Sequence, residues 1–252
     1  MRSLSAWAPE GIPEVRSGAD LAALIIGALR IAGIPPADGD VLVVAQKVVS
    51  KAEGSVRDLA EVAAGDDAQR LARLSGKDAR LVQVILDESR AILRVRPGLV
   101  IAEHRLGYVC ANAGVDHSNV GLGESWVCLL PQDPDASAAA IRRAVGDAFG
   151  VDAAVVINDS HGRPFREGTV GVAIGSAGLE PLLSFIGQVD RSGYTLRASV
   201  EAVADELAAA ASLLQGQAAE GTPLVVIRGA RYDAGTSPSA RLLRVAEKDM
   251  FR

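Results

Sequence analysis

Hydrophobic residues near the start of the chain recur at helical spacing and then give way to a continuous apolar run. Residues 20–32 place apolar side chains at positions 21, 24, 25, 28, 29 and 32, with Gly33 and two prolines beyond them, which predicts a buried helix. Residues 41–49, VLVVAQKVV, are rich in β-branched side chains and predict a strand that is covered on both faces. The start of the chain therefore predicts a helix followed by a buried strand.

Helical and strand patterns alternate through the rest of the chain. Between residues 64 and 89, Leu, Ile and Val recur at helical spacing, and Gly76 divides the stretch into two predicted helices. Residues 95–111 predict a hairpin that turns near residues 103–105. The remaining predicted elements are a strand at 127–130, a helix at 136–149 that Asp135 caps and Gly150 ends, a strand at 151–158, a hairpin turn at 190–194, a helix at 200–214 and a strand at 224–228.

Together these elements predict an α+β fold in which mixed sheets are packed with helices. No internal repeat, low-complexity tract or linker divides the chain, so residues 1–252 are expected to form one compact unit, with two lobes as the alternative arrangement. Hydrophobic residues make up 49% of the chain and aromatic residues only 4%, so the core must consist mainly of Ala, Val, Leu and Ile. Cys110 and Cys128 lie in apolar segments and are expected to be buried thiols rather than a disulfide.

The charge and hydropathy of the chain argue against two classes of partner. A formal net charge of −5 gives no basic excess, which argues against a nucleic-acid partner. No apolar run approaches the roughly 18 residues that cross a bilayer, and the first residues lack the apolar stretch of a signal peptide. We therefore expect a cytoplasmic protein that does not associate with membranes. The three histidines lack the spacing of a zinc site.

Two short clusters of oxygen-bearing side chains follow predicted strands. The members are Asp116, Ser118 and Asn119 in GVDHSNVG at residues 114–121, and Asp159 and Ser160 in INDSHGR at residues 157–163. Oxygen ligands of this kind suit the hard divalent cations that accompany nucleotide phosphates. Asp, Ser and Asn also form ordinary turns by hydrogen bonding to nearby backbone. The residues alone therefore leave a metal site and a pair of turns as open alternatives.

Basic side chains offer candidate phosphate ligands. Lys47 and Lys51 lie at the far end of the first predicted strand, where open α/β sheets collect ligands, although a solvated strand exit is the alternative. Arg163 and Arg166 lie in the glycine-rich segment 162–178, which could approach an anion closely or form a tight β-rich connection with surface arginines. Neither the P-loop pattern nor the G-x-G-x-x-G pattern occurs, so any nucleotide site must be built in another way.

The order of motifs along the chain resembles that of the coenzyme F420-0:L-glutamate ligases, which are γ-glutamyl ligases of a deazaflavin coenzyme. The motifs are GIPEV at 11–15, VVAQKVVSKAEG at 43–54, GVDHSN at 114–119, LLPQDPDAS at 129–137, DSHGRPFREG at 159–168, VADELAAAA at 203–211 and IRG at 227–229. The resemblance implies GTP-dependent ligation, in which the terminal lactyl carboxylate of the coenzyme is activated as an acyl phosphate and attacked by the α-amine of L-glutamate. GDP and phosphate would be released, and some family members add further γ-linked glutamates.

The resemblance also implies roles for individual residues. Asp116 would bind one divalent cation, and Asp159 with Ser160 would bind a second, Mg or Mn in each case; a monovalent cation is a further candidate. Family members usually have Thr at the position of Ser160 and a small residue at that of His117. No residue is assigned to the amine proton, and Glu201 has no secure place in the pattern. The guanine nucleotide would contact Ile12, Pro13, Glu14, Val15, Gln46, Lys51, Asn119, Leu213, Leu214, Gln215, Gly216, Gln217, Ala218, Ala219 and Glu220.

The implied partners are coenzyme F420-0, L-glutamate and GTP as substrates and a second copy of the chain in a homodimer. Because the chain ends at residue 252, the nitroreductase-like domain of actinobacterial relatives is expected to be absent. One alternative is a related nucleotide-dependent amide ligase that acts on a different acid or amine. Another is a non-catalytic nucleotide-binding or scaffold protein, against which the two carboxylate clusters and Lys51 argue because a scaffold has no need of metal ligands.

Overall fold

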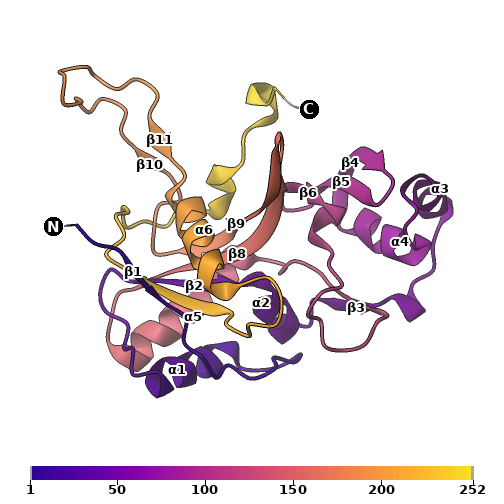
Figure 1. The fold of residues 1–252 in the computed structure, drawn as a ribbon, viewed down its shortest axis with the longest axis horizontal. Helices are drawn as coiled ribbons and strands as arrows, with labels where there is room; N and C mark the ends of the chain where they lie inside the picture. The colour runs from indigo at the N-terminus through magenta and orange to yellow at the C-terminus, as the bar shows by residue number, and fades with distance from the viewer. Residues whose placement is uncertain (1, 251–252) are drawn as a thin grey trace.

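A central five-stranded sheet organises the chain, which a computed structural model describes for residues 2–250 (Figure 1). Its strands are, in spatial order, β1 (Ser5–Trp7), β12 (Leu224–Arg228), β2 (Val41–Ala45), β8 (Ala154–Arg163) and β9 (Arg166–Ala177). The neighbours β2 and β8 run parallel, whereas the other neighbouring pairs are antiparallel. The mixed sheet and its helices confirm the predicted α+β class.

Helices cover both faces of this sheet because its strands are apolar on both sides. Leu42 and Val44 point into one core together with α1 (Leu21–Ile31) and α5 (Pro134–Phe149). Val41 and Val43 point into a second core with α6 (Val203–Gln215). Successive strand residues face opposite sides, so one continuous apolar run supplies both cores. Each large side chain fully buried there contributes roughly 1.5–3 kcal/mol to stability.

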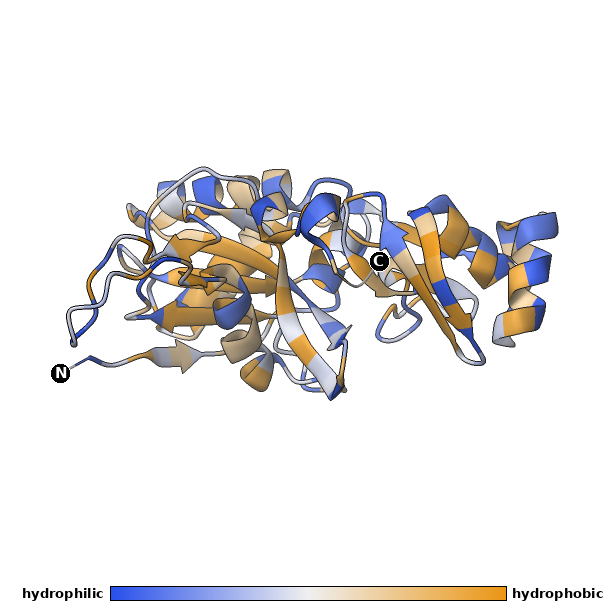
Figure 2. Ribbon diagram, turned by 90° about the horizontal axis from the view of Figure 1, so that it is seen from above, coloured by the Kyte–Doolittle hydropathy of each residue, from blue (hydrophilic) through white to orange (hydrophobic). Residues whose placement is uncertain are grey.

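A second lobe with its own apolar core extends from the central sheet, which makes the molecule elongated (Figure 2). Its three-stranded antiparallel sheet packs against two short helices. The elements of this region are α3 (Asp66–Ser75), α4 (Ala79–Asp87), β4 (Ser89–Arg96), β5 (Leu99–His104) and β6 (Val109–Ala111), with β3 (Val56–Asp58) paired to β7 (Trp126–Cys128). Short 3-10 helices cover Leu59–Glu61, Asn112–Gly114, Ser239–Leu242 and Ala246–Lys248.

A long arm projects from the body between β9 and α6 (Figure 1). The short strands β10 (Leu183–Ser184) and β11 (Val200–Glu201) pair at its base. At its tip, the carboxylate of Asp190 accepts hydrogen bonds from the backbone N–H groups of Ser192, at 2.8 Å, and Tyr194, at 2.9 Å. These bonds confirm the predicted hairpin turn. Within residues 2–250, no helix is both long enough and apolar enough to cross a membrane.

The predicted strand at residues 41–49 is wrong at its far end. The strand stops at Ala45, and α2 (Gln46–Glu53) follows directly. Periodicity cannot separate a short apolar strand from a buried helical turn, so the valines after Lys47 fitted both interpretations. The missed signal was Gly54, which ends α2 in the left-handed conformation at φ 74°. As a result Lys47 and Lys51 lie one turn apart on a helix and not along a strand exit.

Three further predictions need correction. The predicted hairpin at residues 95–111 misses an earlier turn at Pro97–Gly98, which joins β4 to β5. Asp133, not Asp135, caps α5 by accepting a hydrogen bond from the N–H of Ala136 at 2.9 Å, since Pro134 occupies the first helical position. Asp159 does not lie in a turn after a strand, because β8 continues past it in register with β9.

The predicted helices with long, regular periodicity are confirmed. Asp20 caps α1, Gly76 separates α3 from α4 in the left-handed conformation, and Gly150 ends α5. Cys110 and Cys128 are both buried free thiols, as predicted. Burial raises the pKa of Cys110 to about 12 and that of Cys128 to about 11, so neither is a reactive thiolate at neutral pH.

Candidate functional site

A cavity of about 450 Å³ opens at the carboxyl end of β2, where the chain turns into α2. Open α/β sheets bind ligands at this end of their parallel strands. The cavity draws its walls from the 11–15 loop, α2, the segment after Gly114, β8 and the segment after α6. The predicted residues that line it are Ile12, Pro13, Glu14, Val15, Gln46, Lys51, Asp116, Asn119, Asp159, Ser160, Gln215, Gly216, Gln217, Ala218, Ala219 and Glu220.

Several candidate residues lie elsewhere. Leu213 and Leu214 are not part of the cavity wall, and Leu213 is 84% exposed on the outer side of α6. Arg163 lies at the β8–β9 turn and donates to the carbonyl of Glu167 at 3.1 Å, and Arg166 lies across from it in β9. Of the two interpretations of the glycine-rich segment, the structure therefore favours the tight β-rich connection over an anion-binding segment. Glu201 lies in β11 at the base of the arm.

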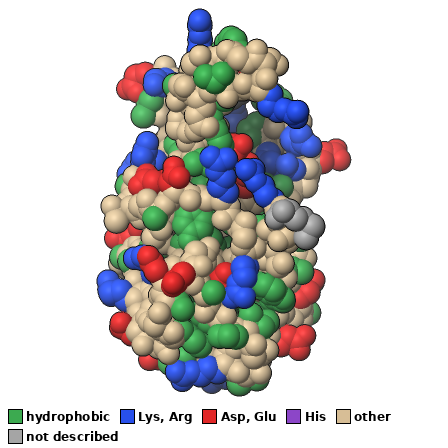
Figure 3. Space-filling model, turned by 90° about the vertical axis from the view of Figure 1, so that its left-hand side faces the viewer, with side chains coloured by type: hydrophobic (Ala, Val, Ile, Leu, Met, Phe, Trp, Pro, Cys, Tyr) green, Lys and Arg blue, Asp and Glu red, His purple; other side chains and the backbone are tan. Residues whose placement is uncertain are grey.

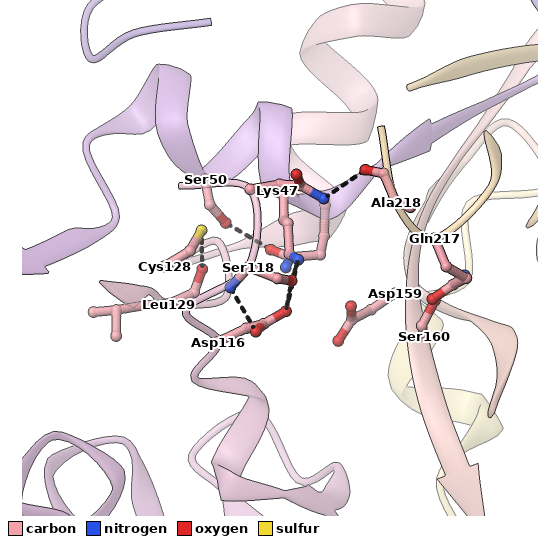
Figure 4. A network of polar contacts seen from close by, with 12 residues as sticks. Lys47, Ser50, Asp116, Ser118, Cys128, Leu129, Asp159, Ser160, Gln217 and Ala218 are labelled. Atoms are coloured by element: carbon pink, nitrogen blue, oxygen red, sulfur yellow. Dashed lines mark hydrogen bonds and ion pairs between the residues drawn. The ribbon is translucent and has the colours of Figure 1, made fainter. Parts of the chain in front are cut away.

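Asp116 is held by Lys47 and Ser118 on one side of the cavity (Figure 4). The ammonium of Lys47 lies 2.6 Å from Oδ2, the same oxygen accepts from the Ser118 hydroxyl at 2.7 Å, and Oδ1 accepts from the Ser118 N–H at 2.9 Å. Burial raises the pKa of Asp116, but the hydrogen bonds from Lys47 and Ser118 lower it by more, and the net shift is downward. Asp116 is therefore a carboxylate at neutral pH, with Lys47 as its counter-ion.

Lys51 ties three walls of the cavity together. Its ammonium forms an ion pair with Glu14 and donates to the carbonyl of Asn119 at 3.1 Å, while its side chain is only 8% exposed. Asn119 has a left-handed backbone at φ 55°, and its side-chain amide donates to the carbonyl of Ala218 at 3.1 Å. The 11–15 loop, the 116–121 segment and the segment after α6 are thereby joined through Lys51 and Asn119.

Asp159 and Ser160 form the opposite side of the cavity (Figure 4). The ring Nε2 of His161 lies 3.1 Å from Oδ2 of Asp159, and the amide of Gln217 donates to the Ser160 hydroxyl at 3.0 Å. Asp159 and Ser160 are therefore each held by a neighbouring polar side chain.

Sequence reasoning assigned no role to His161 or Asn158, and it considered Lys47 only as a phosphate ligand and not as the partner of Asp116. Lys47 pairs with Asp116, and His161 contacts Asp159. Asn158 exchanges hydrogen bonds with the side chain of Gln215, at 2.7 and 3.1 Å, which fixes the end of α6 against β8. The sequence placed Lys47 at the end of a predicted strand, whereas its four-residue spacing from Lys51 places both lysines on one face of α2. The other contacts join distant segments and left no local pattern.

The oxygen atoms in this cavity suit a divalent cation. Asp116 and Asp159 supply carboxylates, and Ser118 and Ser160 supply hydroxyls, from opposite sides. Within the described part of the chain, no three His, Cys, Asp or Glu side chains cluster into a closed metal cage. Mg²⁺ typically uses one or two carboxylates together with substrate phosphates, so the donor set fits a cation shared with a phosphate ligand. The ammonium of Lys47 is paired with Oδ2 of Asp116, an oxygen that such a cation would use as a ligand.

The N-terminus of α2 adds a further anion-binding feature. Ala45, Gln46, Lys47 and Val48 line the cavity, and no side chain caps this end of the helix. Unpaired backbone N–H groups at a helix N-terminus attract phosphate groups. The cavity thus combines a helix N-terminus, two lysines and four carboxylates, Glu14, Asp116, Asp159 and Glu220, around one space.

Comparison with known proteins identifies close relatives. A family model described as F420-0:Gamma-glutamyl ligase matches residues 11–229. The coenzyme F420:L-glutamate ligase of Methanothermobacter thermautotrophicus is 49% identical over 248 residues, which cover 96% of each chain. Proteins of the same name from Methanopyrus kandleri and Archaeoglobus fulgidus are 45% and 42% identical over 243 residues, covering 95% and 96% of this chain and 94% of each relative. Every segment that lines the cavity lies within the matched region.

Proposed function

Because this chain belongs to the F420-0:gamma-glutamyl ligase family, we propose that it joins L-glutamate to coenzyme F420-0 through an amide bond, with GTP as phosphoryl donor. A carboxylate oxygen of the coenzyme attacks the γ-phosphorus of GTP, and the bond from that phosphorus to the β–γ bridging oxygen breaks. GDP leaves and an acyl phosphate forms. The neutral α-amine of glutamate then attacks the acyl carbon, phosphate leaves, and the nitrogen loses a proton. Phosphorylation is needed because a carboxylate oxygen is a poor leaving group.

The observation that carries this proposal is the convergence of the implied nucleotide and metal residues in one cavity. Glu14, Lys51, Asp116, Asn119 and Asp159 are scattered over the sequence but line the same space. The same cavity also contains the N-terminus of α2 and two lysines, which family membership alone does not require. We take this cavity as the site of the GTP phosphates.

The chain's own groups would bind and orient the triphosphate. The N–H groups at the start of α2 would hold phosphate oxygens, and Lys51 would act as a point charge. Asp116 and Asp159 with Ser160 would hold divalent cations, which when bound neutralise charge on the phosphate oxygens. His161 keeps the Asp159 carboxylate in a fixed orientation through its contact at 3.1 Å.

The proposed reaction is tested by incubating the protein with coenzyme F420-0, L-glutamate, GTP and Mg²⁺ or Mn²⁺ and measuring the products by mass spectrometry. We expect the coenzyme to gain glutamyl residues and GDP to form in equal amount. Reactions that lack the cation or contain ATP instead of GTP are the controls. Absence of a glutamyl product under all of these conditions, with a related acid or amine ligated instead, would favour the alternative amide ligase.

Isotope labelling tests the order of chemistry. With ¹⁸O in the terminal carboxylate of the coenzyme, an acyl-phosphate route transfers one labelled oxygen to the released phosphate. Label that stays wholly in the amide product, or formation of GMP, would contradict the proposed route.

A further inference from the structure

A second cavity, of about 750 Å³, adjoins the first across the Lys51–Glu14 ion pair. Glu14, Val15 and Lys51 line both cavities. Gly121 packs directly against this pair, since a Cβ built there would lie 2.7 Å from a carboxylate oxygen of Glu14. The ion pair is therefore a partition with one cavity on each side.

One wall of the second cavity is aromatic and aliphatic. Trp126 in β7 is half-buried, and it lines the cavity together with Val56, Val120 and Leu122. An indole beside aliphatic side chains offers a flat apolar surface, on which a planar heteroaromatic ring can stack. The nucleotide cavity contains no aromatic side chain in its lining.

Another wall carries unpaired positive charge. Arg16 and Arg57 line this cavity, and in the part of the chain that the structure describes neither forms an ion pair. Of the three carboxylates in the same lining, Glu14 pairs with Lys51, and Asp58 accepts the N–H of Ala60 at 2.9 Å. Glu61 forms no ion pair within the described residues. A guanidinium presents a planar set of donors that matches phosphate and carboxylate oxygens. The cavity therefore suits an anion that also carries a flat ring.

We propose that the second cavity binds the acid substrate of the ligase, namely an anion with a planar heteroaromatic ring and a phosphodiester, as in coenzyme F420-0. The ring lies against Trp126, the phosphodiester contacts Arg16 and Arg57, and the terminal carboxylate reaches the Lys51–Glu14 partition. This assignment rests on the proposed function, because phosphoryl transfer requires the acid and the nucleotide to meet within about 3–3.5 Å. Because Glu14, Val15 and Lys51 line both cavities, the acid and the nucleotide would meet at the Lys51–Glu14 pair.

Fluorescence tests the assignment without turnover. The chain has two tryptophans, Trp7 and Trp126, so the Trp7→Phe variant leaves Trp126 as the single indole. Coenzyme F420-0 added without GTP or glutamate is expected to quench this fluorescence saturably, because the deazaflavin would stack on the ring. GTP alone is the control and should quench much less. Saturable binding of the coenzyme, shown by equilibrium dialysis, without a change in Trp126 fluorescence would overturn the assignment.

Steady-state kinetics provide the second arm. Arg16→Ala and Arg57→Ala should each raise KM for the coenzyme by about tenfold or more, with KM for GTP nearly unchanged, because each loses a charge-assisted hydrogen bond. Arg70→Ala, at an exposed site on α3, is the matched control and should leave both KM values unchanged. If both test variants are active and their KM for the coenzyme is unchanged, the proposed binding site is wrong, whereas the proposed function is not affected. If the coenzyme quenches Trp126 fluorescence but no glutamyl product forms, the proposed binding site is supported and the proposed function is contradicted.

Discussion

At the scale of single residues, the candidate metal ligands Asp116 and Asp159 differ in how they are held. Asp116 lies in a loop, where an isolated bridge to Cys128 and the Lys47 ion pair fix it. Asp159 lies within a strand and is fixed by backbone pairing to Val172 on β9. A cation bound between them would therefore join a rigid strand to a segment held mainly by side chains.

We expect Asp116→Asn and Asp159→Asn to reduce ligase activity on the order of 100-fold, because each removes a charge that would hold a cation against the phosphates. Asparagine keeps the shape of the side chain, so the fold should be retained. Glutamyl product measured by mass spectrometry and Mn²⁺ binding measured by electron paramagnetic resonance check the two effects. Asp147→Asn, on the exposed side of α5, is the control. Wild-type turnover in either test variant at saturating metal would show that the cation site is misplaced.

Lys47 is expected to compete with a divalent cation for Asp116, since its ammonium lies 2.6 Å from the carboxylate. Lys47→Met should therefore strengthen Mn²⁺ binding by about two- to fivefold in the absence of nucleotide, the range that corresponds to a partly exposed ion pair. Isothermal titration calorimetry measures this affinity. Weaker Mn²⁺ binding in the variant would mean that Lys47 supports the cation site and does not block it.

At the scale of elements, β9 and α6 approach each other more closely than side chains normally allow. A Cβ on Gly171 would lie 2.3 Å from the carbonyl oxygen of Ala208. The alanine-rich surface of α6 and this glycine permit the contact, which closes one of the two cores beside the central sheet. The same helix ends at Gln215, which lines the cavity.

Gly171→Ala should destabilise the protein by about 1–3 kcal/mol, because the added methyl group must push α6 away from β9. Gly27→Ala is the matched control: it lies inside α1 with nothing within 4 Å of a built Cβ, and alanine there should stabilise by about 0.5–1 kcal/mol. Urea unfolding followed by circular dichroism gives both values. Equal stability of the two variants would contradict the close packing.

The sequence predicted long elements better than short ones. The helical spacing in α1 and α6 extends over several turns, and both helices lie close to their predicted positions. The run at residues 41–49 contains too few residues for its period to distinguish strand from helix, and the structure divides it at Ala45. The β4–β5 turn was missed although the Pro97–Gly98 pair is a strong turn signal.

The candidate site was only partly accessible to sequence reasoning. Oxygen clusters around Asp116 and Asp159 were visible because a short motif carries each of them. The nucleotide residues came from the family resemblance, and the structure brings all of them except Leu213 and Leu214 into the cavity wall. The Asn158–Gln215 pair joins residues 57 positions apart, and tertiary contacts of this kind leave no mark in local periodicity.

At the scale of the whole molecule, the arm between β9 and α6 exposes apolar side chains on an otherwise mixed surface (Figure 3). Ile186 is 56% exposed, Val189 65% and Tyr194 55%. Exposed apolar groups on a projecting segment are typical of contacts between subunits. We propose that the homodimer implied by the family resemblance is formed through this arm.

Replacing Ile186, Val189 and Tyr194 together by serine is expected to convert the proposed dimer into a monomer, because the apolar contact area is lost. Size-exclusion chromatography with light scattering measures the mass of each variant. Ile31→Ser removes an apolar side chain that is even more exposed, at 81% on α1, and should leave the proposed dimer intact. A wild-type protein that is monomeric at micromolar concentration would contradict the proposed dimer.

The partition between the two cavities makes their ligands interdependent. Lys51 has a single ammonium group, which pairs with Glu14 at the boundary of both cavities. If this ammonium turns toward a phosphate in the first cavity, its ion pair with Glu14 becomes weaker. The negative charge of Glu14 is then less neutralised on the side of the second cavity. The freed carboxylate repels an approaching acid and attracts an ammonium group, such as that of the incoming amino acid. Such coupling is reciprocal. The nucleotide changes the binding free energy of the ligand in the second cavity, and that ligand changes the binding free energy of the nucleotide by the same amount. In the proposed reaction, one shared side chain would in this way set the order in which the three substrates bind.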